Sequence, residues 1–188
     1  MRKVILILMA VMAIVFGMEA RQPQCGYRGF VDWSNSLHTY PDYYGLGSKD
    51  TWYYTGVSTT QGYQINRMFY AGLGVGAEKH TGYNNWIVPV YADGRIDLKF
   101  GKFTPFGEIR LGASLSDGAG VYFSPIIGYR FNWGRKVGIN VGVGMSLVGS
   151  HIDVYNITSI EDGYWSFDYV GREARHTVYF SFRLGFDF

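Results

Sequence analysis

Cysteine is nearly absent from this sequence, since Cys25 is its sole occurrence in 188 residues. A single thiol excludes a disulfide framework and metal sites built from several cysteines. Charge is also scarce, because Asp, Glu, Lys and Arg make up 17% of the chain, against about a quarter in an average soluble domain. The net charge of +2 excludes an electrostatic case for binding nucleic acid, which needs a clear basic excess. The length fits one domain.

Proline is scarce too, with 5 residues, whereas glycine contributes 26 residues and aromatic side chains make up 18% of the chain. Disordered chains are poor in aromatic residues and rich in charge. This composition therefore excludes an intrinsically disordered protein and favours a folded one.

Only one long hydrophobic run is present, at residues 4–16, and it directly follows Arg2 and Lys3. Ala20 supplies a small residue where cleavage would fall. This layout predicts a secretory signal peptide at residues 1–20 and a mature domain at residues 21–188. The alternative, an uncleaved anchor, is disfavoured because a helix needs about 20 apolar residues to span a bilayer.

An alternation of apolar and polar residues dominates the rest of the chain. Even positions from 178 to 188 are all Val, Phe or Leu, and the positions between them carry Tyr179, Ser181, Arg183, Gly185 and Asp187. The same period of two recurs at 109–116 and 137–147, and it indicates strands with two unlike faces. With the turn signals, it predicts eight strands near residues 26–36, 51–61, 67–80, 86–100, 103–117, 120–132, 136–151 and 175–188.

The predicted connections between these strands alternate in length. Those at 62–66, 101–102 and 133–135 are short, whereas those at 37–50 and 152–174 are long, and 80–85 and 117–120 fall on the same side as the long ones. Short turns on one side and longer loops on the other are typical of transmembrane barrels. We therefore predict an all-β, eight-stranded antiparallel up-and-down transmembrane β-barrel, with both ends of the mature chain on the side of the short turns.

Alternation alone fits either a soluble, lipocalin-like barrel with an apolar interior or a membrane barrel with an apolar exterior. The polar face here is rich in Gly and Ser, which suits the narrow interior of an eight-stranded barrel. Its charges nearly balance, and all its cations are arginine, which pairs well with carboxylates in partly buried sites. The predicted network in the lumen consists of Arg28, Asp32, Glu78, Asp93, Arg95, Asp97, Glu108, Arg110, Arg130, Arg183 and Asp187.

Aromatic residues gather at the ends of the predicted strands. One group lies near the longer loops: Trp52, Tyr53, Tyr83, Trp86, Tyr122, Phe123, Tyr164 and Trp165. The other lies near the short turns: Tyr63, Phe69, Phe100, Phe103, Trp133, Phe186 and Phe188. Two aromatic girdles around an apolar band match the two interfaces of a bilayer, although strands in general are enriched in aromatic residues.

Three stretches resemble the small eight-stranded outer-membrane β-barrels of Gram-negative bacteria, the OmpA/OmpX type, and especially barrel proteins abundant in Bacteroidetes. They are the final strand at 178–188 with its terminal aromatic residue, the segment 62–66 and the segment 123–129. The resemblance implies a place in the bacterial outer membrane and contact with its lipid and lipopolysaccharide. It also implies periplasmic chaperones and the outer-membrane assembly machinery as partners, the latter reading a terminal signal made by Phe182, Leu184, Phe186 and Phe188.

The sequence contains only weak candidates for a catalytic or metal-binding site. The four histidines, His38, His80, His151 and His176, fall near the longer loops without paired ligand spacing, so no metal site and no cofactor are predicted. Ser150 and His151 are adjacent, which places their side chains on opposite faces of a strand and opposes proton transfer between them. We therefore predict that the protein is not an enzyme.

The predicted role is envelope architecture or surface interaction through long extracellular loops. Candidate recognition residues are Tyr40, Tyr43, Tyr44, Tyr164 and Trp165, because exposed aromatic patches often mark binding surfaces, although such rings also rest at lipid interfaces. The surface ligand is left open. A narrow channel for small solutes is an alternative, limited to a small conductance by the charged side chains in the lumen, and a lipid-modifying enzyme is a weaker one.

Overall fold

The computed structural model describes residues 25–39, 51–81, 86–98, 102–115, 120–133, 137–159 and 165–188, so the predicted signal peptide at 1–20 lies outside the described residues. The strands are β1 (Gly26–Thr39), β2 (Thr51–Gln64), β3 (Phe69–His80), β4 (Trp86–Ile87), β5 (Pro89–Asp97), β6 (Phe103–Ser114), β7 (Gly120–Trp133), β8 (Val137–Ser159) and β9 (Trp165–Asp187). The described part contains no helix long and apolar enough to cross a membrane.

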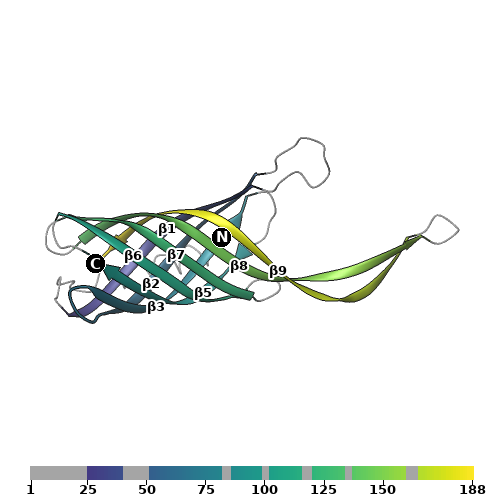
Figure 1. Cartoon of the computed structure of the whole chain (residues 1–188), viewed down its shortest axis with the longest axis horizontal. Coiled ribbons are helices and arrows are strands. Elements are labelled where there is room, and N and C mark those ends of the chain that lie inside the picture. The colour runs from purple at the N-terminus through teal and green to yellow at the C-terminus, as the bar shows by residue number, and fades with distance from the viewer. Residues whose placement is uncertain are drawn as a thin grey trace, which may run out of the picture.

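The strands form one closed antiparallel wall (Figure 1). With β4 and β5 taken together, each strand pairs with the next along the chain. β1 also pairs with β9, which closes the barrel. β4 and β5 are two parts of a single strand, because both pair with β3 and are separated by Val88 alone. Pro89 follows this break and lacks the N–H that a continuous ladder needs. The prediction of an all-β, eight-stranded up-and-down barrel is therefore confirmed.

The connections sort to opposite ends of the barrel. Residues 65–68, 98–102 and 134–136 join strands at one end, which we call the short-turn end. β1 begins and β9 ends there as well, since the Gly29 amide donates to the Phe188 carbonyl at 2.9 Å and the Phe188 amide donates back at 3.0 Å. The connections at 40–50, 81–85, 115–119 and 160–164 belong to the other end, the loop end.

β8 and β9 are longer than the other strands, with 23 residues each. The β7–β8 pairing ends at Val148, and the β1–β9 pairing ends at Phe180. Beyond these points β8 and β9 pair only with each other, from Gly149↔His176 to Ser159↔Trp165. These eleven pairs form a two-stranded ribbon that projects past the barrel rim (Figure 1), roughly 35 Å at the usual rise per residue.

This ribbon corrects the predicted loop at 152–174, most of which is strand. The register shifts between Val154 and Tyr155, so β9 carries one extra residue at this point. Gly171 lies beside the shift with a φ of +154°, a conformation that residues with a Cβ rarely adopt. An inserted residue changes the phase of a period-two pattern, and this is why the alternation could not be followed along the sequence here.

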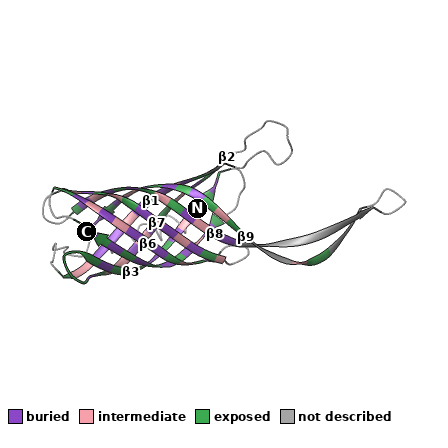
Figure 2. Ribbon diagram, in the orientation of Figure 1, coloured by how far each residue is buried: buried purple, intermediate pink, exposed green. Residues whose placement is uncertain are grey.

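The barrel is polar inside and apolar outside. Buried and exposed residues alternate along its strands (Figure 2), and β5 does so at every position. Outward-facing residues on neighbouring strands include Leu73, Ile109, Leu111 and Ile127, of which 53–72% of the surface is exposed. A soluble domain has the opposite arrangement, because large apolar patches rarely remain exposed on its surface. The interior is consequently where polar chemistry is concentrated.

Candidate functional site

The structure places all eleven charged residues of the predicted lumen network inside the barrel, each at most 8% exposed. They come from six strands, namely β1, β3, β5, β6, β7 and β9. Because inward-facing positions recur every second residue along a strand, side chains from distant parts of the chain meet on the axis. The network falls into two layers, one near the short-turn end and one at mid-barrel.

The layer near the short-turn end joins three arginines to two aspartates. Asp187 accepts hydrogen bonds from Arg28 Nε at 3.1 Å and from Arg130 Nε at 2.9 Å. Asp97 accepts from Arg28 Nη1 at 2.8 Å and from Arg95 Nε at 3.0 Å. Each carboxylate therefore bridges two guanidinium groups, which is how buried charges are accommodated.

Aromatic rings complete this layer. The Arg95 guanidinium lies 3.6 Å from the centroid of Phe106 and 5.0 Å from that of Phe30, so it is held between two rings. Arg28 lies 4.7 Å from the same Phe30 ring. Such cation–π contacts use the planar guanidinium face, while its edge donates hydrogen bonds.

The mid-barrel layer centres on Arg110, which is 2% exposed. Its Nε donates to Glu108 Oε1 at 2.7 Å and lies 3.3 Å from Asp93 Oδ2, and its Nη2 donates to Asp32. Arg183 reaches the same Glu108 carboxylate from β9. Arg110 thus neutralises carboxylates on three strands, and its loss would leave several buried charges without a partner.

Hydroxyl groups line the wall beside this layer. The Oγ atoms of Ser36 and Ser181 are 2.9 Å apart, those of Ser181 and Ser146 are 2.8 Å apart, and those of Ser146 and Ser124 are 2.9 Å apart. This serine chain crosses four neighbouring strands and ends near Arg183, whose Nη2 lies 3.4 Å from Ser124. This row of hydrogen-bonded serines was not predicted from the sequence, although the small polar residues on the inward face indicated that hydroxyl groups lie there.

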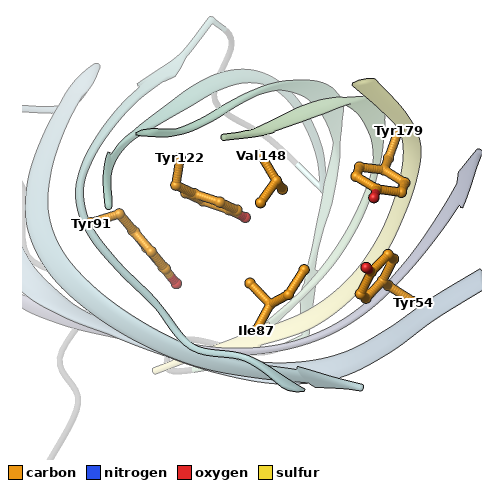
Figure 3. Packing of buried hydrophobic residues seen from close by; sticks show 6 residues of the cluster. All are labelled: Tyr54, Ile87, Tyr91, Tyr122, Val148 and Tyr179. Atoms are coloured by element: carbon orange, nitrogen blue, oxygen red, sulfur yellow. The ribbon is translucent and has the colours of Figure 1, made fainter. Parts of the chain in front are cut away.

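Apolar and aromatic side chains point into the lumen in the half of the barrel toward the loop end (Figure 3). The cluster contains Tyr54, Ile87, Tyr91, Tyr122, Val148 and Tyr179, all buried. Tyr54 meets Tyr179 edge to face with ring centroids 5.0 Å apart, and Tyr91 lies 5.8 Å from Tyr122. Below it, Glu78 accepts a hydrogen bond from Ser34 at 3.3 Å. Side chains therefore occupy the lumen from the ion-pair layers to this cluster, as an eight-stranded cylinder permits.

Inward-facing glycines make room for these rings. Gly74 of β3 is paired with Tyr91 of β5, and a Cβ at position 74 would lie 2.5 Å from Tyr91 Cζ and 2.7 Å from its hydroxyl. The ring thus rests directly on the glycine backbone. Gly94 of β5 faces outward, and a Cβ there would have nothing within 4 Å.

Replacing Gly74 with alanine should therefore destabilise the barrel, because the Tyr91 ring has to leave its position. We expect a loss of about 1–3 kcal/mol in the free energy of unfolding, the usual cost of overpacking, measured by urea titration in lipid vesicles. Gly94→Ala is the matched control and should change stability by less than about 0.5 kcal/mol. Equal effects of the two substitutions would contradict the described packing.

The exterior carries aromatic residues near both rims. Tyr53 and Trp86 are exposed near the loop end, and Tyr63, Phe69 and Phe103 are exposed near the short-turn end. Tyr122, which belongs to the aromatic group near the longer loops, points into the lumen and is 2% exposed. Its even position on β7 gives it the parity of Arg130, and the adjacent Phe123 takes the outward direction.

Comparison with known proteins supports the fold. The chain is similar to the crystal structure of Neisserial surface protein A (NspA), with a TM-score of 0.58 and 11% sequence identity. The match covers 88% of this chain and 98% of that one. No protein-family model and no curated protein matches the chain. The likeness shows a shared small β-barrel fold, and the narrower resemblance to the OmpA/OmpX or Bacteroidetes type stays a prediction.

Of the five predicted recognition residues, Trp165 alone belongs to the described residues. Tyr40, Tyr43, Tyr44 and Tyr164 lie outside the described residues. Trp165 was predicted to lie in a loop, but it begins β9 and pairs with Ser159 at the far end of the ribbon. The cause is the same undetected pairing that turns most of 152–174 into strand.

The predicted assembly signal occupies the end of β9. Phe182 and Phe186 are exposed on the outer face, Leu184 is half-buried between them, and Phe188 follows the strand. The Phe188 ring lies against Gly29, where a Cβ would approach it to 2.7 Å. The terminal residue is therefore held in the seam between the first and last strands.

The histidines do not form a site within the described ranges, which contain no group of three or more His, Cys, Asp or Glu arranged to hold a metal ion. His80 ends β3 and is 2% exposed inside the barrel. Its ring meets Tyr54 edge to face at 4.7 Å. His176 is exposed at the base of the ribbon.

Proposed function

We propose that this chain is an integral outer-membrane β-barrel without enzymatic activity, which stabilises the envelope and carries an interaction surface outside the cell. The observation that carries the proposal is the inverted polarity of the barrel. Its arginines and carboxylates are paired inside, whereas Val, Leu, Ile and Phe cover the outside. An apolar outer band flanked by aromatic residues is what a barrel in hydrocarbon requires.

The orientation follows from the two ends of the barrel. In barrels of this kind the short turns face the periplasm and the longer loops face outward. The short-turn end, with the start of β1 and the end of β9, would then lie in the periplasm. Residues 1–20 would direct export through periplasmic chaperones, and Phe188 with its strand would be read by the assembly machinery. The outer rim would contact lipid and lipopolysaccharide.

The ribbon is the part of the described structure best placed for surface interaction. The register pairs Tyr155 with Tyr169, Ile157 with Phe167 and Ser159 with Trp165 along the ribbon. Tyr169 and the neighbouring Val170 are each 58% exposed. Exposed aromatic residues that project beyond a membrane surface favour binding to another molecule.

A deletion of residues 151–174, replaced by a short glycine-containing turn, separates the barrel from the ribbon. We expect the shortened protein to remain in the outer-membrane fraction and to keep the gel shift between unheated and boiled samples, because the ribbon pairs with no other strand. Protease added to intact cells should cut the full-length ribbon and leave the barrel protected.

Three outcomes would contradict this proposal. The chain could appear in the soluble fraction, the ribbon could be cut only after the outer membrane is permeabilised, or the purified barrel could produce large ohmic steps in planar bilayers. The last result would favour the channel alternative, which the filled lumen opposes. Altered lipid A mass spectra in a deletion strain would instead favour the enzyme alternative.

A further inference from the structure

Charges outside the lumen are distributed very unequally between the two ends of the barrel. The three connections of the short-turn end, residues 65–68, 98–102 and 134–136, contain five basic residues and no acidic one. The five are Arg67, Lys99, Lys102, Arg135 and Lys136. Arg67 and Lys102 belong to the described residues, and both are exposed at this end of the barrel.

The loop end has the opposite sign. Its connections and the ribbon, residues 40–50, 81–85, 115–119 and 149–176, contain eight acidic residues and three basic ones. The acidic residues are Asp42, Asp50, Asp117, Asp153, Glu161, Asp162, Asp168 and Glu173. A chain with a net charge of only +2 therefore carries a basic end and an acidic end.

The described cations of the short-turn end lie directly beside the exposed aromatic band. Lys102 precedes Phe103, which is 60% exposed, and its Nζ lies 5.6 Å from the ring centroid of Phe131. Arg67 is exposed at the tip of a turn in which Asn66 Oδ1 accepts hydrogen bonds from the amides of residues 68 and 69. Phe69, two residues beyond Arg67, is 45% exposed.

We propose that the short-turn end is a binding surface for the anionic headgroups of phospholipids in the surrounding leaflet. The inference rests on the proposed insertion of the barrel in a membrane. Aromatic rings settle at the headgroup level, so the adjacent cations lie where phosphate groups are concentrated. Basic residues at such a depth attract anionic lipid, and long side chains reach the interface while their stems contact apolar surface.

A lipid partner is favoured over an acidic protein because the described cations, Arg67 and Lys102, lie in short turns at the edge of the apolar band. A docking surface for a protein would project beyond the membrane, as the ribbon does at the opposite end. The lack of any acidic residue in the three connections also leaves these cations without local partners in their own turns.

The chain offers a matched control at the opposite rim. Lys79 of β3 is exposed, and its Nζ lies 5.8 Å from the ring centroid of Trp86. Lys102 and Lys79 thus have the same charge and the same kind of aromatic contact at opposite ends of the barrel. Substituting glutamine for either one removes a cation at a comparable depth.

The test places the full mature chain in nanodiscs of phosphatidylcholine with one-fifth phosphatidylglycerol and counts retained lipids by native mass spectrometry. We expect phosphatidylglycerol to be enriched about fivefold next to each cation at low salt. Combining Arg67→Gln, Lys99→Gln, Lys102→Gln, Arg135→Gln and Lys136→Gln should return it to its bulk fraction. Lys79→Gln should preserve most of the enrichment, and about 1 M salt, where the screening length is about 3 Å, should abolish it.

Equal retention of phosphatidylglycerol by the wild type and by the variant with all five substitutions would overturn the inference. The inference would also be overturned if Lys79→Gln alone reduced the enrichment as much as the five substitutions do. If the variant with five substitutions does not fold, the pair Arg67→Gln and Lys102→Gln should still reduce the enrichment measurably. Binding of soluble polyglutamate without any lipid preference would assign the surface to an acidic protein and overturn the lipid partner. A wild-type chain that gives no heat-dependent gel shift in nanodiscs would instead refute the proposed function, and this inference with it.

Discussion

Arg110→Met should lower the free energy of unfolding by about 3–5 kcal/mol, the usual effect of removing one partner from a buried ion network. Arg110 contacts Glu108, Asp93 and Asp32 and lies 4.7 Å from the centroid of Tyr91. Methionine fills part of the space but supplies no charge. Three buried carboxylates would remain, of which Glu108 would keep its contacts with Arg183 and Arg95.

The measurement is urea unfolding in lipid vesicles, followed by tryptophan fluorescence. Lys79→Met removes a cation from an exposed position and should change stability by less than about 0.5 kcal/mol. Adding Asp93→Asn to Arg110→Met should recover part of the loss, because one fewer buried carboxylate then lacks a partner. A loss below about 1 kcal/mol for Arg110→Met would mean that water or ions replace the guanidinium, so that the lumen is open rather than filled.

Val143→Arg should cost about 2–4 kcal/mol if this part of the wall faces the bilayer midplane. Val143 lies on the outer face of β8, is 41% exposed and pairs with Ile127 and Phe182, which also face outward. An arginine there would have to extend through hydrocarbon to reach water or headgroups. The effect should appear as weaker folding into vesicles and should increase with the thickness of the bilayer.

The control for this substitution has to be an exposed valine that does not face lipid. Val170→Arg in the ribbon meets that condition, because Val170 is 58% exposed and lies beyond the barrel rim. It should leave folding unchanged. Gly142 is unsuitable despite being adjacent to Val143, since a Cβ there would approach Ile126 Cγ2 to 2.7 Å. Equal effects at 143 and 170 would show that the outer face is not in hydrocarbon.

The barrel itself could be predicted from sequence because its physical signal is local. A wall between lipid and a narrow lumen imposes unlike environments on successive residues, so the parity of Arg110, Arg183 and Asp187 follows directly from the alternation. Their individual partners could not be predicted. Which carboxylate meets Arg110 depends on register and shear between strands, and neither is encoded in the alternation of one strand.

The errors arose where the pattern loses that local constraint. At the ribbon, an extra residue near Gly171 shifts the phase, and no lipid–lumen contrast maintains the alternation. Tyr122 and His80 show a different limit. Both lie at strand ends near the loop end, where an aromatic ring can face either the interface or the lumen, and composition does not distinguish the two.

The pairing of β1 with β9 also has a consequence for biogenesis. Arg28 and Asp187, which meet across this seam, are 159 positions apart in the chain, so the wall cannot be finished until β9 has been synthesised. Every shorter product presents two open hydrogen-bonding edges that can pair with other chains. Late closure of this kind makes folding slow and exposes intermediates to aggregation, and a nascent chain of this design gains most from being held unfolded until its final strand is available.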